Sequence, residues 1–107
     1  MLISVVITSY NYARYIERAI RSVFNQSINR SEFELIVVDD ASSDNTMQVL
    51  ENYKGEIRIL QFKTNRGLSA ARNEGVKKSK GQFVFFLDAD DYLHRDLLLI
   101  QKTFLDR

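Results

Sequence analysis

Four short apolar runs, each followed by a segment with helical periodicity, constrain the fold of this chain more than any other feature. The runs at 2–8, 33–38 and 82–87 are almost continuously apolar and rich in β-branched or aromatic residues, which is typical of strands covered on both faces. The run at 57–62 alternates more clearly and suits an edge strand. This order predicts a mainly parallel sheet, right-handed crossovers and helices on both sides, a three-layer α/β/α fold.

The segments between these runs carry apolar residues at helical spacing. Ile16, Ile20 and Val23 share one helical face, whereas Glu17 and Arg21 lie on the other. Helices are expected around residues 16–24, from a cap at Ser42 or Ser43 through Met47, Leu50 and Tyr53, over 68–79, and from His94 through Leu97, Ile100 and Phe104.

The last of these helices has an unusual composition. Leu97, Leu98, Leu99 and Ile100 follow one another directly, so the helix has apolar surface on more than one side. A freely solvated helix rarely carries so much apolar surface. We therefore predict that this helix packs against a partner, with a homodimer as the expected form.

The overall composition excludes several classes of protein. With 15 Lys+Arg, 14 Asp+Glu and a formal net charge of +1, the 107-residue chain has no field that would recruit nucleic acid or an anionic membrane. There is no cysteine and only one histidine, His94, which argues against disulfides and a zinc centre. The opening run is too short for a signal peptide or a membrane span. We expect a single cytoplasmic domain over residues 1–107, with no integral membrane segment and no nucleic-acid partner.

Polar residues follow three of the four expected strands, at 8–11, 39–42 and 88–91. Ligands of open α/β sheets bind at the carboxyl ends of the strands, and five carboxylates on one rim repel one another unless a cation compensates. No glycine-rich phosphate loop is present. Hard divalent cations prefer oxygen ligands and bridge diphosphates, and Asp88 and Asp90 at positions i and i+2 can face one ion. The sequence therefore predicts Mn²⁺ or Mg²⁺ held by Asp88 and Asp90.

Four segments in this order carry a resemblance to a known family: TSYNYARYIERAIRSVFNQS at 8–27, FELIVVDDASSDNT at 33–46, NRGLSAARNEG at 65–75 and GQFVFFLDADD at 81–91. Together they resemble the inverting family 2 glycosyltransferases. The resemblance implies a truncated, Rossmann-like GT-A fold, as in nucleotide-diphospho-sugar transferases, with residues 1–107 as its N-terminal nucleotide-sugar-binding part. It places the acceptor site and the catalytic base beyond Arg107, so we expect no catalytic residue in this chain.

The resemblance also assigns roles to particular positions. The expected substrate is a UDP-sugar used in cell-surface polysaccharide synthesis, and the full-length enzyme is expected to lie at most peripherally at the inner face of the membrane. Independently of the resemblance, the side-chain amide of Asn65 can donate a hydrogen bond to a carbonyl of the nucleotide's base. By resemblance, Thr8 and Tyr10 border the nucleotide, Asp39 and chiefly Asp40 bind the uracil edge, Arg72 approaches the diphosphate, and Asp88, Ala89 and Asp90 form the metal-binding Asp-x-Asp element with Asp90 as the direct ligand.

Simpler interpretations and two other functions compete with this one. The run VFFLDADD resembles the nucleophile strand of haloacid-dehalogenase-like phosphotransferases, and IVVDDAS resembles the acidic pair of receiver-type signalling domains, although the later motifs of both are missing. The individual residues have structural alternatives: helix capping for Asp39 and Asp40, a solvated turn for 88–91, an ion pair with Glu74 or another carboxylate for Arg72, and ordinary rim or core packing for Tyr10 and Tyr12.

Overall fold

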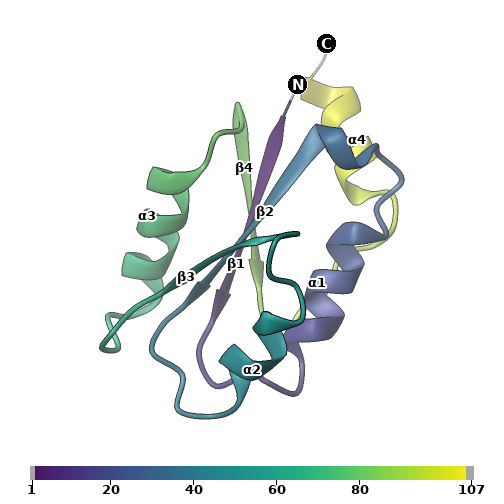
Figure 1. The fold of residues 1–107 in the computed structure, drawn as a ribbon. Coiled ribbons are helices and arrows are strands. Elements are labelled where there is room, and N and C mark those ends of the chain that lie inside the picture. The colour runs from purple at the N-terminus through teal and green to yellow at the C-terminus, as the bar shows by residue number, and fades with distance from the viewer. Residues whose placement is uncertain (1, 106–107) are drawn as a thin grey trace.

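The computed structural model describes residues 2–105 and shows a parallel sheet with helices on both faces (Figure 1). The sheet contains four strands in the order β3-β2-β1-β4, and every neighbouring pair is parallel. This confirms the predicted α/β fold. The elements are β1 (Ile3–Ser9), α1 (Ile16–Phe24), the 3-10 turn η1 (Arg30–Glu32), β2 (Phe33–Asp39), α2 (Thr46–Glu51), β3 (Arg58–Gln61), α3 (Leu68–Lys78), β4 (Phe83–Asp88) and α4 (Leu97–Leu105).

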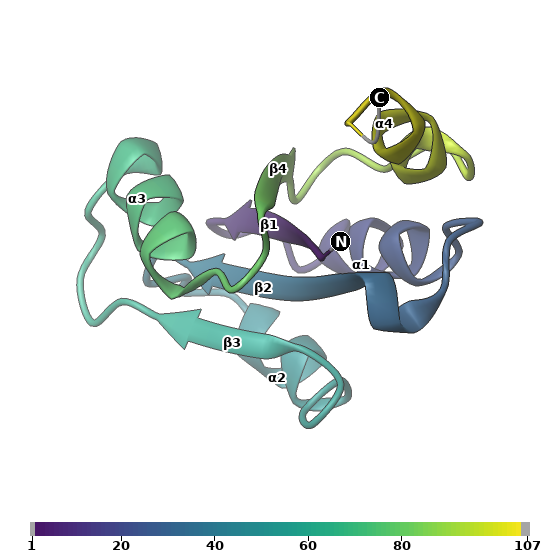
Figure 2. The same ribbon diagram turned by 90° about the horizontal axis from the view of Figure 1, so that it is seen from above.

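The two faces of the sheet are covered unequally. Helices α1, α2 and α4 pack on one face, where the larger apolar cluster includes Ile7, Ile20, Leu50 and Leu98. Helix α3 covers the other face alone, and its position apart from the other helices is visible in both ribbon views (Figure 2). The central strands β1 and β2 are therefore buried almost throughout, as their continuous apolar sequence predicts.

Helix α3 lies unusually close to β1 because it has glycine at position 75. A Cβ built at Gly75 would lie 2.3 Å from Val6 Cγ1, so no larger residue fits without movement. Ala71, one turn earlier, is also buried against the sheet. This close approach brings the N-terminal half of α3, which carries Arg72, to the carboxyl ends of β1 and β4.

Helix α2 begins later than the sequence predicts. Its first helical residue is Thr46, and neither Ser42 nor Ser43 caps it, so that expectation was wrong. The Asp44 carboxylate instead accepts a hydrogen bond from the Thr46 amide at 3.0 Å. The two serines are used elsewhere, because the Ser42 hydroxyl accepts from the Asn11 amide and the Ser43 amide donates to the Asn11 side chain.

The sheet has two edges, β3 and β4. The sequence predicts β3 as an edge, and this is confirmed. Strand β4 forms the other edge, and Phe83 and Phe86 are 39% and 40% exposed although the apolar run suggested a covered strand.

In α4, Leu98 is buried but Leu99 and Ile100 remain exposed. No helix within residues 2–105 is long and apolar enough to span a membrane. The predicted homodimer through α4 stays a prediction.

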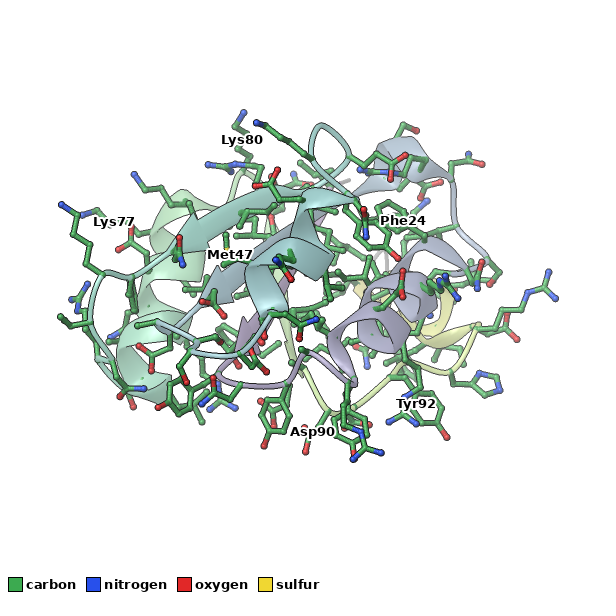
Figure 3. The ribbon with its side chains drawn as sticks, turned by 60° about the horizontal axis from the view of Figure 1, so that its bottom comes forward. Phe24, Met47, Lys77, Lys80, Asp90 and Tyr92 are labelled. Carbon is green, nitrogen blue, oxygen red and sulfur yellow. The ribbon has the colours of Figure 1, made fainter. Side chains whose placement is uncertain are left out.

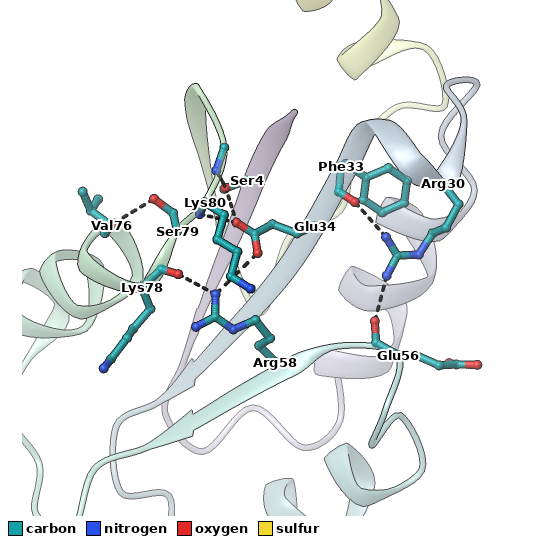
Figure 4. A network of polar contacts seen from close by, with 11 residues as sticks. Ser4, Arg30, Phe33, Glu34, Glu56, Arg58, Val76, Lys78, Ser79 and Lys80 are labelled. Carbon is teal, nitrogen blue, oxygen red and sulfur yellow. Dashed lines mark hydrogen bonds and ion pairs between the residues drawn. The ribbon is translucent and has the colours of Figure 1, made fainter. Parts of the chain in front are cut away.

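A polar network fastens the amino-terminal side of the sheet (Figure 4). The Glu34 carboxylate of β2 accepts hydrogen bonds from the Ser4 hydroxyl at 2.6 Å and from the Lys80 amide, and it pairs with Arg58 of β3. Burial alone would raise the pKa of Glu34, but these hydrogen bonds and the Arg58 charge outweigh it, so the pKa lies below its ordinary value. The network fixes the connection from α3 into β4, and so the start of the strand that ends in the acidic run.

Candidate functional site

A pocket of roughly 510 Å³ opens at the carboxyl ends of β1, β2 and β4. Residues from both ends of the chain line it, because the strand order places β1 between the ends of β2 and β4. Six of the residues predicted from the sequence are among them, which the fold brings together from positions 8 to 90. The lining consists of Thr8, Ser9, Tyr10, Tyr12, Asp40, Asn65, Gly67, Leu68, Ala71, Asp88 and Asp90.

Two loops, after β1 and after β2, are tied together at one side of this pocket. Asn11 has a left-handed backbone with φ of 59°, and its side-chain oxygen accepts hydrogen bonds from the amides of Ser43 at 2.8 Å and Asp44 at 3.3 Å. In return, the Asp44 carboxylate accepts from the Ala13 amide at 3.1 Å. Burial raises the pKa of Asp44, but the hydrogen bonds from Thr46 and Ala13 lower it by more. These loops fix the backbone on either side of Tyr10 and Tyr12.

Asp40 joins the end of β2 to the start of α3. It is 5% exposed, and its two carboxylate oxygens accept hydrogen bonds from the backbone amides of Arg66 at 2.7 Å and Gly67 at 2.9 Å. Gly67 precedes the first residue of α3 and has a positive φ of 92°, which favours glycine. The Asn65 amide also donates to the Asp40 carbonyl at 3.3 Å. A carboxylate has about four acceptor positions, so Asp40, with two of them occupied, can still accept from a donor in the pocket.

Asp39 does not line this pocket. It is fully buried, and its carboxylate accepts hydrogen bonds from the amide and the hydroxyl of Ser42. Neighbouring residues of a strand point to opposite faces, so Asp39 lies on the face of the sheet covered by α1 and α2. Neither Asp39 nor Asp40 is the cap of α2, which begins at Thr46. The capping interpretation therefore fails for α2, although Asp40 does hold the amides that lead into α3.

The acidic end of β4 is much more accessible. The Asp88 side chain is 54% exposed, and its Oδ1 atom lies 3.4 Å from the Thr8 hydroxyl and 3.7 Å from a terminal nitrogen of Arg72. Ala89 is fully buried, and its amide donates to the Thr8 carbonyl at 3.1 Å. Asp90 is exposed and lines the pocket. Asp88 and Asp90 therefore border one space on either side of a buried alanine.

This pair of carboxylates suits a hard divalent cation in chemistry but does not enclose one. Within residues 2–105, no group of three or more histidine, cysteine, aspartate or glutamate side chains is placed to hold a metal ion. Asp88 and Asp90 supply oxygen donors, which Mn²⁺ and Mg²⁺ prefer. Asp88 and Asp90 would therefore supply only part of the coordination of such a cation, and its remaining ligands would come from outside these two side chains.

Arg72 lies beside the pocket rather than in its lining. Its guanidinium carbon is 5.5 Å from the centre of the Phe86 ring, and its ion pair is with Asp88 rather than with Glu74. It borders a smaller hollow of roughly 270 Å³ that shares Asp88 with the main pocket. The Arg72 Nε atom is buried without a hydrogen-bond partner among the described residues. The Arg72 side chain is nevertheless 42% exposed, so its terminal nitrogens can bind an anion next to Asp88.

Five residues of the pocket were not predicted to bind a ligand. Ser9, Gly67, Leu68 and Ala71 were assigned no binding role, and Tyr12 was considered only as a rim or core aromatic. Ser9 directly follows Thr8, and its buried hydroxyl has no partner within the part of the chain that the structure describes. Gly67 follows Asn65 and Arg66 in the turn before α3. This turn was the only sequence signal that residues at the start of α3 would line the pocket.

The family model described as Glycosyl transferase family 2 matches residues 4–107, and the chain belongs to this family. It is 44% identical over 99 residues to the poly(ribitol-phosphate) beta-N-acetylglucosaminyltransferase TarP of Staphylococcus aureus, a match that covers 90% of this chain and 30% of TarP. It is 37% identical over 107 residues to the putative teichuronic acid biosynthesis glycosyltransferase TuaG of Bacillus subtilis, which covers 97% of this chain and 42% of TuaG.

Two solved structures extend these similarities to the fold. Residues 1–349 of S. aureus TarS in complex with UDP-GlcNAc match with a TM-score of 0.92 and 37% identity, over 99% of this chain and 31% of that one. The mannosyltransferase PcManGT of Pyrobaculum calidifontis, in complex with GDP-Man and Mn²⁺, matches with a TM-score of 0.89 and 26% identity, over 98% of this chain and 32% of that one. These matches confirm the GT-A fold and decide against the phosphotransferase and receiver alternatives. The chain spans between about a third and two fifths of the length of these relatives.

Proposed function

We propose that this chain forms the donor-binding part of a glycosyltransferase that transfers a sugar from a UDP-sugar to an acceptor hydroxyl in cell-surface polysaccharide synthesis. The observation that carries the proposal is the pocket that gathers Tyr10, Asp40, Asp88 and Asp90 at one edge of the sheet. The complex of TarS with UDP-GlcNAc supports UDP as the nucleotide. The similarity to TarP, a poly(ribitol-phosphate) glycosyltransferase, and to TuaG, a putative teichuronic acid biosynthesis glycosyltransferase, supports an anionic polymer as the acceptor.

The uracil base is assigned to the part of the pocket between β1 and α3. There the Asp40 carboxylate accepts the N3–H of the base with the capacity that its two backbone hydrogen bonds leave free. Asn65 lies beside it and offers its amide to a base carbonyl. Tyr10 is 47% exposed at the mouth of the pocket, and Thr8 lies between Asp40 and Asp88 along the lining. The base is therefore placed next to Asp40, and the diphosphate extends from it toward the carboxyl end of β4.

The diphosphate is assigned to the end of β4. Asp88 and Asp90 would hold Mn²⁺ or Mg²⁺, which neutralises charge on the departing nucleoside diphosphate, while Ala89 keeps the two carboxylates apart. The presence of Mn²⁺ in the PcManGT complex supports a metal of this kind. Arg72 adds a second positive charge through the guanidinium that lies next to Asp88. When a nucleotide binds, Arg72 would replace its ion pair with Asp88 by a hydrogen bond to a phosphate oxygen.

An acceptor hydroxyl needs a general base on the opposite side of the anomeric carbon. We propose that this base and the acceptor site belong to sequence beyond Arg107, as the resemblance implies. The 107-residue chain is therefore expected to bind UDP weakly and to transfer no sugar. Peripheral association with the inner face of a membrane and a cytoplasmic location stay predictions.

Calorimetric titration of the chain with UDP, dTDP and GDP, each with and without Mn²⁺, tests the proposal directly. We expect UDP to bind only in the presence of the divalent metal, and more tightly than GDP. Sugar transfer is measured in parallel with UDP-GlcNAc and should be absent apart from slow hydrolysis. Metal-independent binding, a preference for GDP, or robust transfer by this chain would each contradict part of the assignment.

A further inference from the structure

One side of α1 carries three polar residues that all contact the segment after β4. Arg18, Ser22 and Gln26 are spaced four residues apart, so they lie in one row along the helix and just past its end. Their contacts fall on residues 90–98, which begin with Asp90. We call this row of three residues the α1 row.

Arg18 contacts the acidic turn itself. A terminal nitrogen of Arg18 donates to the backbone carbonyl of Asp90 at 3.1 Å. Its guanidinium carbon also lies 4.6 Å from the ring centre of Tyr92 and 5.8 Å from that of Tyr15. Figure 3 shows Asp90 and Tyr92 on the same side of the molecule. Arg18 therefore fixes the residues on both sides of Asp91 with one hydrogen bond and one cation-π contact.

Ser22 and Gln26 hold the rest of the segment. The Ser22 hydroxyl accepts from the Leu93 amide at 3.0 Å. The Gln26 amide group donates to the His94 carbonyl at 2.7 Å, and its oxygen accepts from the Leu98 amide at 2.9 Å. Gln26 is 6% exposed, so these bonds form away from water, where losing one is costly.

The described segment between β4 and α4 has no helix or strand, and apart from the α1 row Asp90 is held by its neighbour Ala89, whose amide donates to the Thr8 carbonyl at 3.1 Å. Between β4 and α4 its described hydrogen bonds within itself include those of the Asp91 amide to the Asp88 carbonyl and of the Tyr92 amide to the Asp91 side chain. Asp88, Asp90 and Asp91 are exposed and carry like charges, which favours their separation when no cation is bound. The α1 row opposes this separation through the backbone, so it leaves the carboxylates free.

We infer that Arg18 and Gln26 are positioning residues that keep Asp90 at the pocket before metal and nucleotide bind. The inference rests on the proposed function, and it adds a role for α1, which contributes no side chain of its own to the pocket lining. Holding a ligand in place in advance removes the cost of ordering it during binding. Residues that orient metal ligands without touching the metal therefore affect affinity.

The test compares Arg18→Met with Arg21→Met, which removes the same charge from the same helix. Arg21 is a matched control because its side chain is 68% exposed and pairs with Glu17, away from Asp90. We expect Arg18→Met to weaken Mn²⁺-dependent UDP binding about three- to tenfold and to speed amide hydrogen exchange at residues 90–93, with an almost unchanged Tm. Arg18→Lys, which keeps a donor and a charge, should recover part of both losses. Arg21→Met should match the wild type.

Gln26→Glu provides a second variant with a separate readout. It keeps an acceptor for the Leu98 amide but loses the donor to the His94 carbonyl, so exchange should increase at residues 93–95. The inference is overturned if Arg18→Met leaves both UDP affinity and exchange unchanged, or if Arg21→Met causes an equal loss. If the wild type binds no UDP with Mn²⁺, the proposed function fails instead, and the exchange rates alone decide whether the α1 row positions this segment.

Discussion

The two acidic strand ends of this molecule look alike in sequence but are built differently. After β2, Asp40 is 5% exposed and both of its carboxylate oxygens accept backbone hydrogen bonds, at 2.7 and 2.9 Å. After β4, Asp88 is half exposed and its nearest partners lie at 3.4 and 3.7 Å. The carboxylate after β2 stabilises the loop that leads into α3, whereas the carboxylates after β4 remain available to bind a ligand. Two carboxylates of the same residue type therefore differ in hydrogen-bond occupancy: Asp40 uses both of its oxygens within the fold and keeps limited capacity for a ligand, whereas Asp88 remains largely available.

Replacing Asp40 should produce the largest effect and tests this contrast most directly. In Asp40→Ala the amides of Arg66 and Gly67 lose their acceptor, and the free energy of unfolding should fall by about 3 kcal/mol, since each hydrogen bond to a charged group contributes about 1.5–3 kcal/mol. Urea unfolding measures the change. Asp88→Ala is the control at the other strand end and should cost less than about 0.5 kcal/mol. Equal costs would mean that the two ends do not differ as described.

The close approach of α3 to β1 holds Arg72 near the end of β4, and forcing the helix away from the strand should lower the stability of the fold. Gly75→Ala places a methyl group against Val6, and unfolding should become easier by about 2 kcal/mol, although alanine in an open helix position would stabilise by about 1 kcal/mol. Thermal unfolding measures this change. The double variant with Val6→Ala should recover much of the loss, and Lys77→Ala on the exposed side should have no cost. A stabilised Gly75→Ala would show that the contact is loose.

Asp90→Asn sharpens the other half of the comparison, because it should alter binding without altering stability. The change removes a charge and a strong metal ligand, so UDP affinity in Mn²⁺ should fall at least about tenfold, or about 1.4 kcal/mol. The free energy of unfolding should change by less than about 0.5 kcal/mol, since the carboxylate is exposed and near like charges. Calorimetry and urea unfolding give the two values. Unchanged UDP affinity would remove Asp90 from the site.

Glu34, at the amino-terminal end of the central strand β2, gives the smallest expected effect and a dependence on pH. Its pKa lies below its ordinary value of 4.5, so the ionised form is favoured by folding. The stabilisation is complete above the unfolded pKa and is lost as the pH falls through the folded pKa. Glu34→Gln should therefore cost about 1 kcal/mol at pH 7, and the difference from wild type should shrink below about pH 4.5. Urea unfolding between pH 3 and 7 measures this, and a constant difference would contradict it.

Much of the fold follows from local sequence patterns. The apolar run at 2–8 became β1, Ile3–Ser9, and the alternating run at 57–62 contains the edge strand β3. The start of α2 could not be predicted in this way. Ser42 and Ser43 can either cap a helix or form hydrogen bonds with residues that the fold brings close to them. Asn11, 31 residues away from Ser42 in the chain, decides between these alternatives.

The sequence by itself determined which residues end the strands, and the parallel order then placed Thr8, Asp40, Asp88 and Asp90 at one pocket. Only the tertiary structure decided what each one does there. Asp39 lies on the other face, Asp40 lines the pocket while it accepts hydrogen bonds from the loop before α3, and the α1 row contacts the segment that carries Asp90. The physical reason is that a chain order fixes which elements meet, whereas hydrogen-bond partners and solvent exposure depend on distances between residues far apart in sequence.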